Sequence, residues 1–388
     1  MFSLFKRKKE SLFNGYINDT NFSKKLSFRD DGGLILITLS IANDRYTFML
    51  DTGAFSVVPK NLLTTDNLTQ LDETIYTLDA SGEKKESTLY RLHSLELAGI
   101  HFNDFSVIVD DFAKDFPLSC LQFDGILGYN FLQKFILEIN YEEKYIQLFD
   151  SYKKDKSFTA IKLIQTKSNA PSFQIYYNAK SYLVGLDTGN NDHLLINDPA
   201  LIQELEIEGN SIERITGTFS TTFSGQNRYS FIDRYLLKNF TIEKKILVES
   251  TQLIFQEESL NIAGNAFLSQ FHLVLDLEKK KLFLKKRDKN ILKKEQNRFG
   301  FITFWNEEKK LYISAIIQGS PAYNSKLKIG DKIMSINELD TLNFSQEEYC
   351  KHTLRSKRVM LYDEDDTELS IIVKRDGKLI REQLSLSL

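Results

Sequence analysis

The stretch Tyr46-Thr47-Phe48-Met49-Leu50-Asp51-Thr52-Gly53 ends a run of mostly apolar residues with an acid, a hydroxyl and a glycine. A second stretch, Tyr182-Leu183-Val184-Gly185-Leu186-Asp187-Thr188-Gly189, has the same form, and its acid lies 136 positions later (187 − 51). A single Asp-Thr-Gly is most simply a β-turn, because Asp and Gly are favoured in turns. Two copies, each directly after a predicted strand, indicate an internal repeat.

The repeat extends to a second motif at the same separation. Ile126-Leu127-Gly128 in the first half corresponds to Ile262-Ala263-Gly264 in the second, again 136 positions apart (264 − 128). Other matched positions follow each motif: Phe135 with Phe271, Asn140 with Asp276, and Leu148 with Leu284. We therefore interpret most of the chain as two halves of one unit.

Between residues 30 and 286 the apolar residues alternate with polar ones or form short runs rich in β-branched and aromatic types. This pattern is typical of strands, so the sequence predicts a mainly β fold. Short helices are expected at 59–63, 128–133, 199–205 and 264–269.

The composition changes after residue 286. Residues 279–298 are basic and polar and indicate a linker. A third unit follows, with an expected strand at 312–317 and a turn and helix start at Ser320-Pro321-Ala322, because proline suits the first helical position.

Composition excludes several classes of function. The net charge of −3 is not that of a generally basic nucleic-acid binder. Two cysteines and five scattered histidines give no thiolate or zinc-hydrolase motif, so no metal or cofactor is expected. Because Cys120 and Cys350 lie in different predicted units, we do not expect a disulfide between them. No run approaches the roughly 18–20 apolar residues of a membrane helix.

Two facing carboxyls can carry out hydrolysis without a metal. Like charges about 3 Å apart cannot both ionise, so the pair shares one proton. The ionised acid can take a proton from water while the protonated acid polarises a carbonyl. A threonine hydroxyl can brace the pair, and glycine lets backbone N–H groups approach each carboxyl.

Asp51-Thr52-Gly53-Ala54 with Ile126-Leu127-Gly128, and the corresponding second set, resemble the retropepsin and pepsin class of aspartic peptidases. The resemblance covers roughly 30–290 and is nearest to bacterial aspartyl proteases with a C-terminal PDZ domain. It implies two retropepsin-like β-barrel lobes in a bilobed acid-protease fold. The expected segments are an N-terminal segment at 1–29, lobes at 30–150 and 151–290, and a PDZ domain at 298–388.

The resemblance also implies the roles of the site residues. Asp51 and Asp187 would form the catalytic pair, and the four supporting positions would be Thr52, Gly53, Thr188 and Gly189. The second motif continues as Asn190, where the class usually has Ala, Ser or Thr, and the residues after it are more polar than in the first half. Because Ala54 lacks the hydroxyl usual in pepsin-like enzymes, we predict a mildly acidic to neutral optimum rather than one near pH 2–3.

Enzymes of this class cover the substrate with β-hairpin flaps. The candidate residues in the first half are Ala80, Ser81 and Gly82, and those in the second are Thr216 and Gly217. Ser224-Gly225-Gln226 is another possible hairpin tip. Each of these could equally be an ordinary hairpin turn.

The third unit resembles a PDZ domain. Arg298-Phe299-Gly300-Phe301 matches the carboxylate-binding loop, and the segment from Gly319 to Asn337 matches the domain's core. PDZ domains add an extended peptide to a sheet edge. A C-terminal peptide is thus a possible partner, and a structural or autoinhibitory role is the alternative.

The sequence therefore predicts an aspartic endopeptidase that acts on peptide or protein substrates, with a PDZ domain for substrate binding or regulation. The alternatives are a peptide-binding protein that kept the fold without catalysis, and an adaptor that works through its PDZ domain. No signal peptide is recognised, so location stays open between cytoplasm and, if an export signal was removed, periplasm or cell envelope.

Overall fold

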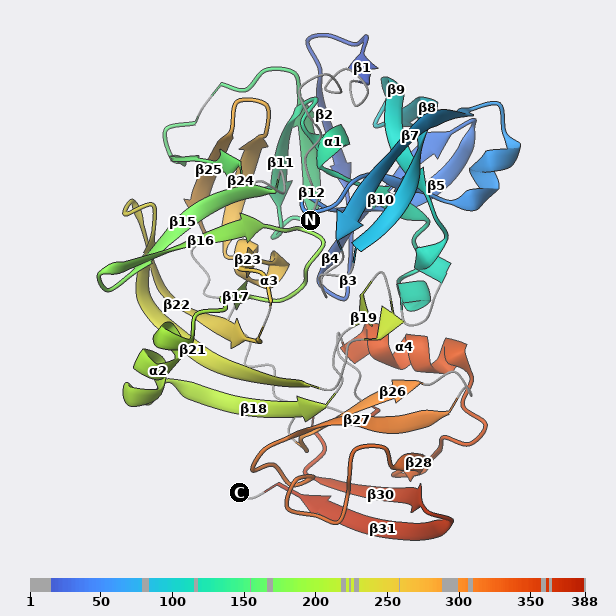
Figure 1. Cartoon of the computed structure of the whole chain (residues 1–388), viewed down its shortest axis with the longest axis vertical. Coiled ribbons are helices and arrows are strands. Elements are labelled where there is room, and N and C mark those ends of the chain that lie inside the picture. Colours follow the sequence, from blue (N-terminus) through green and yellow to red (C-terminus); the bar gives the residue numbers. More distant parts are fainter. Residues whose placement is uncertain are drawn as a thin grey trace.

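The computed structural model describes residues 15–386 apart from several short internal segments. These are 79–83, 115–117, 154, 166–169, 218–220, 223–224, 227–229, 258, 288–298, 306–309, 357–360 and 363–364. Strands dominate the described residues, and they form two lobes above a smaller C-terminal domain (Figure 1). This confirms the predicted mainly β, bilobed fold class.

The first lobe is built on one sheet with the strand order β1-β9-β6-β10-β5-β4-β8-β7, and β3 pairs with β4. Its strands are β1 (Tyr16–Ile17), β3 (Arg29–Asp31), β4 (Leu34–Ile41), β5 (Asp44–Leu50), β6 (Val57–Val58), β7 (Leu68–Leu78), β8 (Lys84–Leu97), β9 (Ile100–Val109) and β10 (Gly125–Leu127). Its short helices are η2 (Lys60–Thr64), η3 (Phe112–Lys114), η4 (Leu118–Leu121) and α1 (Tyr129–Leu132).

The second lobe repeats the central part of this plan. Its strands are β14 (Ile164–Gln165), β15 (Pro171–Tyr177), β16 (Lys180–Leu186), β17 (Leu194–Leu195), β18 (Ser211–Gly217), β19 (Thr221–Thr222), β20 (Gly225–Gln226), β21 (Ser230–Ile242), β22 (Ile246–Phe255) and β23 (Ile262–Ala263). Its helices are α2 (Pro199–Ile207) and α3 (Asn265–Leu268). The four short helices predicted in the two lobes are confirmed as η2, α1, α2 and α3. Asp198 caps α2 through the N–H groups of Ala200 and Leu201.

A six-stranded sheet joins the two halves, in the order β13-β25-β24-β11-β12-β2. Its strands are β2 (Ser23–Ser27), β11 (Ile136–Asn140), β12 (Tyr145–Phe149), β13 (Thr159–Lys162), β24 (Phe271–Asp276) and β25 (Lys281–Lys286). At its centre β11 pairs with β24, so the matched Phe135 and Phe271 segments lie side by side. Strand β2, within the N-terminal segment, pairs with β12 and completes this sheet.

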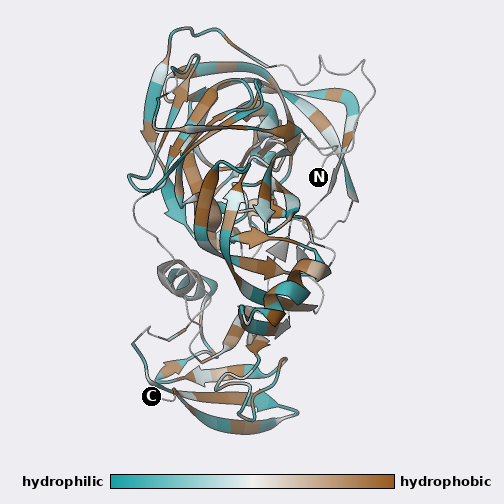
Figure 2. Cartoon of the chain, turned by 90° about the vertical axis from the view of Figure 1, so that its left-hand side faces the viewer, coloured by the Kyte–Doolittle hydropathy of each residue, from teal (hydrophilic) through white to brown (hydrophobic). Residues whose placement is uncertain are grey.

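Most buried apolar residues of both halves form one continuous cluster that runs from Phe22 to Leu284, and two smaller clusters accompany it. Along the strands hydrophobic and hydrophilic residues alternate (Figure 2), as in β12, where buried and partly exposed positions follow each other. This period of two places one face of each strand in the core. A shared core agrees with two halves of one unit.

The C-terminal domain contains β26 (Phe301–Trp305), β27 (Leu311–Ile317), β28 (Lys332–Ile336), β29 (Leu339–Asp340), α4 (Gln346–Ser356), β30 (Glu368–Arg375) and β31 (Lys378–Ser385). The strand expected at 312–317 is confirmed as β27. A helix does not begin at Ser320-Pro321-Ala322. Instead, the chain makes turns there, in which Ser320 accepts a hydrogen bond from the N–H of Tyr323.

The sheet of the second lobe continues into the C-terminal domain. Strand β18 pairs with β27 in the register Ile215↔Ile317, Thr216↔Ile316 and Gly217↔Ala315. This domain lies on the side of the molecule opposite the six-stranded sheet (Figure 1).

Candidate active site

The two predicted acids occupy equivalent places, each just beyond a central strand. Asp51 follows β5, and Asp187 follows β16. In the first lobe β10 lies parallel to β5, and its Leu127 carbonyl accepts a 3.0 Å hydrogen bond from the N–H of Asp51. In the second lobe β23 lies parallel to β16, and the Ala263 carbonyl accepts from Asp187 N–H at 3.1 Å. The apolar-apolar-Gly motif therefore positions each acid.

The glycine of that motif is needed for close packing. A Cβ atom on Gly128 would lie 2.4 Å from the carbonyl oxygen of Ala54, and one on Gly264 would lie 2.4 Å from that of Asp192. Real Cβ atoms do not approach backbone so closely. These glycines let the turn after each motif press against the loop that carries the acid.

The carboxyl groups of Asp51 and Asp187 face each other across the two loops, close enough for each to affect the pKa of the other. Asp51 Oδ1 also accepts from the N–H groups of Gly53 at 2.7 Å and Ala54 at 3.0 Å, and Asp187 Oδ1 accepts from that of Gly189 at 2.9 Å. A Cβ on Gly189 would lie 2.2 Å from Asp51 Oδ2, and one on Gly53 would lie 3.0 Å from Asp187 Cγ. Each glycine therefore makes room for the opposite acid.

Thr52 and Thr188 brace the pair through four reciprocal hydrogen bonds. The N–H of Thr52 donates to Thr188 Oγ1 at 3.0 Å, and the N–H of Thr188 donates to Thr52 Oγ1 at 3.1 Å. Thr52 Oγ1 then donates to the Leu186 carbonyl at 2.8 Å, and Thr188 Oγ1 donates to the Leu50 carbonyl at 2.9 Å. Both threonines are fully buried. We call these two residues the threonine brace, since they fix one lobe against the other.

Burial dominates the electrostatics of the pair. It raises the pKa of the Asp51 carboxyl well above its ordinary value, and the nearby charge of Asp187 raises that pKa further. Burial raises the pKa of Asp187 as well, while hydrogen bonds from Gly189 N–H and from Asp51 act in the opposite direction. The pair therefore retains a proton at a pH where an exposed carboxyl would have lost it.

Two asparagines support the acid loops and were not predicted. Asn130 Oδ1 accepts from the N–H of Ser56 at 2.9 Å, and its Nδ2 donates to the Ser106 carbonyl at 2.9 Å. In the second lobe Asn265 Nδ2 donates to the Thr188 carbonyl at 2.7 Å. In the sequence, each asparagine lies within two residues of a motif glycine, at Gly128-Tyr129-Asn130 and Gly264-Asn265. This proximity is the sequence signal that could have indicated the two asparagines.

Asn190 has a local role in the second loop. Its Oδ1 accepts from the N–H of Asp192 at 2.7 Å, and its carbonyl accepts from the N–H of Asn265 at 2.7 Å. The neighbouring Asn191 Nδ2 donates to the Gly32 carbonyl of the first lobe at 2.8 Å. The polar residues after the second motif thus hold that loop in place and reach across to the other lobe.

The flap candidates have different surroundings. Ala80, Ser81 and Gly82 lie outside the described residues, between β7 and β8 in the sequence. Thr216 and Gly217 end β18, where they pair with Ile316 and Ala315 of the C-terminal domain. The Gly225-Gln226 part of the other possible hairpin tip forms β20, which pairs with β19.

The proposed carboxylate-binding loop leads into β26. Phe299 is fully buried, and its carbonyl accepts from the N–H of Ala322 at 2.9 Å. Gly300 has a positive φ of 81°, and a Cβ there would collide with Ser320 at 2.0 Å. Phe301 is the first residue of β26, and Arg298 lies outside the described residues.

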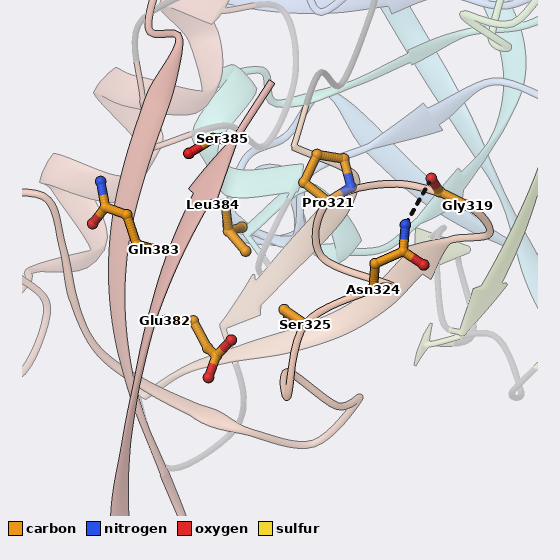
Figure 3. A pocket seen from close by; sticks show the side chains of 8 residues that line it. All are labelled: Gly319, Pro321, Asn324, Ser325, Glu382, Gln383, Leu384 and Ser385. Carbon is orange, nitrogen blue, oxygen red and sulfur yellow. Dashed lines mark hydrogen bonds between the residues drawn. The ribbon is translucent and has the colours of Figure 1, made fainter. Parts of the chain in front are cut away.

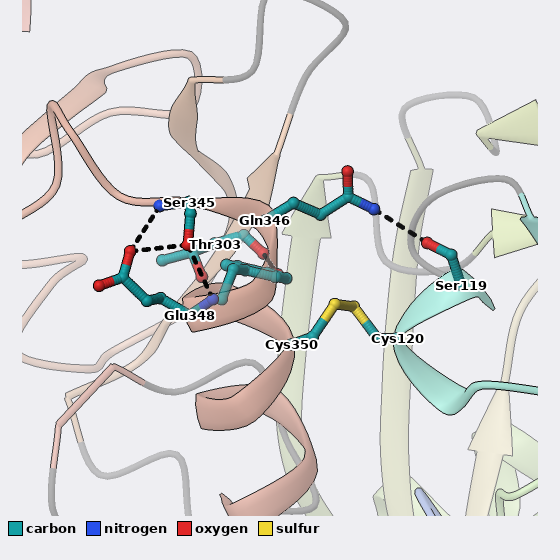
Figure 4. The surroundings of a disulfide bond; sticks show 8 residues. Ser119, Cys120, Thr303, Ser345, Gln346, Glu348 and Cys350 are labelled. Atoms are coloured by element: carbon teal, nitrogen blue, oxygen red, sulfur yellow. Dashed lines mark hydrogen bonds between the residues drawn. A yellow bond between two sulfur atoms is a disulfide. The ribbon is translucent and has the colours of Figure 1, made fainter.

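The two cysteines form a disulfide, contrary to our expectation. Cys120 of η4 is bonded to Cys350 of α4, with the Cα atoms 4.8 Å apart (Figure 4). The prediction was wrong because it treated separate units as distant, whereas the C-terminal domain packs α4 directly against η4. The bond spans 230 positions of sequence, a distance at which residue spacing carries no information about contact.

A pocket of about 360 Å³ lies in the C-terminal domain, between β31 and the turns after β27 (Figure 3). Its lining includes Glu382, which pairs with Lys326 at 3.6 Å, and Asn324, whose Nδ2 donates to the Gly319 carbonyl at 3.3 Å. It contains neither predicted acid. Within the described parts of the chain, no group of three or more His, Cys, Asp or Glu is arranged to hold a metal ion. In those same parts, no helix has the length and hydropathy needed to cross a membrane.

Two symmetric loops thus bring one acid each to a braced pair between two β lobes. Comparison with known families agrees: residues 37–131 match the aspartyl protease family, and residues 290–361 match the PDZ domain. Both resemblances drawn from the motifs are thereby confirmed. The chain carries an aspartyl protease family segment in its first half and a PDZ domain near its C-terminus.

Among solved structures, the chain is similar to an aspartic proteinase from Irpex lacteus. The identity is 14%, the TM-score is 0.48, and the match covers 70% of this chain and 99% of that one. Among curated proteins, no sequence matches this chain.

Proposed function

We propose that this protein is an aspartic endopeptidase whose catalytic residues are Asp51 and Asp187. The observation that supports this most directly is the close approach of each carboxyl to the glycine of the opposite loop, with the two loops held in register by the threonine brace. Acids are rarely buried together without a function, because desolvation and like charge both oppose ionisation.

The two acids take different roles in the proposed mechanism. Burial and the nearby like charge keep one proton on the pair, so one carboxyl is protonated and the other is ionised. The ionised acid accepts a proton from a water molecule, which attacks the peptide carbonyl carbon. The protonated acid donates its hydrogen bond and then its proton to the carbonyl oxygen. The tetrahedral diol collapses when the acid that took the water proton passes it to the leaving nitrogen. A diol hydroxyl then returns a proton to the other acid, and no covalent enzyme intermediate forms.

In this proposal, lobes at 30–150 and 151–290 hold an extended substrate between them, and a PDZ domain at 298–388 follows. Phe299, Gly300 and Phe301, together with Arg298, would contact a peptide carboxylate at the start of β26. PDZ domains bind peptides by adding a strand to a sheet edge. The domain would therefore recruit substrates or bind a regulatory C-terminus.

A peptide-cleavage assay tests the proposal. Full-length wild type, Asp51→Asn and Asp187→Asn are incubated with a fluorogenic peptide library between pH 3 and 8. Both variants should lose cleavage, because Asn can neither share the proton nor act as a base. Asp192→Asn is the matched control, since it removes an acid near the pair in sequence and should retain cleavage.

Absence of cleavage by wild type across this range, with peptide binding retained, would contradict the enzyme. That result would favour a binding protein with the same fold. Equal cleavage by wild type and Asp51→Asn would show that another group carries the reaction.

A further inference from the structure

The C-terminal domain is attached to both lobes, by a different kind of bond on each side. Strand β27 joins the second lobe through β18, and α4 joins the first lobe through the Cys120–Cys350 disulfide. The domain thus forms a link between the lobes on the side opposite the six-stranded sheet (Figure 1). We call this arrangement the interlobe link.

The attachment to the second lobe is a continuous sheet with its own small core. Ile215, Ala315 and Ile317 form a buried apolar cluster at the junction. The Gln318 N–H donates to the Arg214 carbonyl at 2.8 Å. The side chain of Arg214 makes a two-pronged ion pair with buried Asp233 on the neighbouring strand β21. This side of the link is held by many weak interactions.

Gly217 shows how tight this junction is. It has a φ of 138°, and a Cβ atom there would lie 2.1 Å from the Ser314 carbonyl oxygen. Only glycine therefore fits where β18 meets β27.

The attachment to the first lobe depends on one covalent bond. Beside the disulfide, Gln346 Nε2 of α4 donates to Ser119 Oγ of η4 at 3.0 Å (Figure 4). Cys120 is buried within the core of the C-terminal domain, whereas Cys350 is partly exposed. A reductant can therefore reach the sulfur of Cys350 more readily than that of Cys120.

Helix η4 connects the disulfide to the surroundings of the site. Leu118 and Leu121 of this helix pack against an apolar cluster that includes Phe55, in the loop after Asp51, and Ile75 of β7. Strand β7 is one arm of the first-lobe hairpin, and β18 is one arm of the second-lobe hairpin. The interlobe link thus contacts the second-lobe hairpin directly and reaches the first-lobe hairpin through η4.

We propose that the Cys120–Cys350 disulfide is a thiol-controlled clasp that restrains the two lobes across the acid pair. A dithiol reductant opens it in two steps. A reductant thiolate attacks Cys350 Sγ, and Cys120 leaves as a thiolate. The second reductant thiol then displaces Cys350, which leaves two protein thiols and an oxidised, disulfide-containing reductant. The sheet junction at β18 holds through both steps.

The clasp controls access, a consequence that rests on the proposed function. With the disulfide formed, the C-terminal domain spans the open side of the lobes, and bulky substrates are excluded more strongly than short peptides. With the disulfide reduced, η4 is released from α4, and the C-terminal domain can move away from the first lobe while the threonine brace keeps the acid pair together. Reduction should therefore favour cleavage of folded proteins over cleavage of short peptides.

Hydrogen exchange on the full chain tests the clasp without relying on catalysis. Peptides covering 118–121 and 68–78 should exchange several-fold faster after reduction, while the central strand β24 should not change. Cys350→Ser should show the faster exchange without reductant and no further response to it. Cys120→Ala also removes the disulfide but leaves α4 unchanged. It therefore separates loss of the disulfide from any disturbance that Cys350→Ser causes in α4 itself.

The outcomes separate the clasp from the proposed activity. Failure to recover a crosslinked peptide containing Cys120 and Cys350 from the oxidised protein would overturn the clasp, and so would identical exchange before and after reduction. Wild type should show a several-fold rise in the ratio of protein to peptide cleavage on reduction, and Cys350→Ser should not. An unchanged ratio in an active enzyme would overturn control of access. If exchange responds but nothing is cleaved, the clasp stands and the proposed function fails.

Discussion

Replacing Thr188 with valine should separate the threonine brace from simple packing. Valine has nearly the shape of threonine but lacks Oγ1, so the variant loses two hydrogen bonds of the brace and keeps the buried volume. The N–H of Thr52 and the carbonyl of Leu50 would lose a partner in a site where both residues are almost fully buried.

The size of the effect follows from those two groups. A buried polar group left unpaired costs about 1–3 kcal/mol, so two such groups cost about 2–6 kcal/mol. A loss of 2 kcal/mol corresponds to a fall in Tm of about 4 °C or more in a domain of moderate size. The catalytic rate should fall more steeply, since a carboxyl displaced by about 1 Å can cost about 100-fold.

Thermal unfolding and kcat measurements on three variants check this reasoning. Thr188→Ser keeps the hydroxyl and should lie close to wild type in both measurements. Thr64→Val makes the same exchange at an exposed position and should change stability by less than about 0.5 kcal/mol. If Thr188→Val proves as stable and active as Thr188→Ser, the brace hydrogen bonds do not hold the acid pair and the reasoning is refuted.

Four further predictions concern the pair. Gly189→Ala should abolish cleavage and Gly53→Ala should reduce it less, because the added Cβ lies 2.2 Å from Asp51 in one case and 3.0 Å from Asp187 in the other. Gly185→Ala is the control, since its Cβ would come no closer than 3.6 Å to its neighbours. Equal losses in the first two variants would contradict the geometry. Because the folded protein binds a proton more tightly at Asp51 than the unfolded chain does, stability should fall as pH rises above the ordinary carboxyl pKa. Asp51→Asn should flatten this fall in Tm between pH 4 and 8. If the Tm of Asp51→Asn falls with pH in parallel with that of wild type, the raised pKa of Asp51 does not contribute to stability. The rate should peak at mildly acidic to neutral pH, and activity per chain should not fall on dilution to nanomolar concentration, since both acids are in one chain; a maximum near pH 2–3 or a dilution loss would argue against these two points.

The pairing of Asp51 with Asp187 could be anticipated because the same local motifs recur in both halves of the chain at one constant separation. A strand, an Asp-Thr-Gly turn and an apolar-apolar-Gly strand are short-range patterns, and duplication places them symmetrically. The same logic anticipated that Thr52 and Thr188 would meet. The roles of Asn130 and Asn265 could not be anticipated in the same way, because the two residues do not occupy matching positions in the repeat.

The relations between the lobes and the C-terminal domain could not be read from the sequence. Pairing of β18 with β27 joins segments about a hundred residues apart, and neither strand carries a pattern that specifies its partner. The Cys120–Cys350 bond depends on how two separately folded units pack, which residue spacing does not encode. Non-local contacts of this kind emerge only from the three-dimensional arrangement.

The six-stranded sheet and the threonine brace have a consequence for synthesis on the ribosome. Each brace hydroxyl donates to a carbonyl 134 or 138 positions away, and the central pairing of β11 with β24 joins residues just as distant. Domains emerge from the ribosome N-terminal part first. A nascent chain that has released only its first half therefore displays a single acid without its partner. The carboxyl pair comes into being only after the second half is made, so a product truncated after its first half lacks the pair altogether.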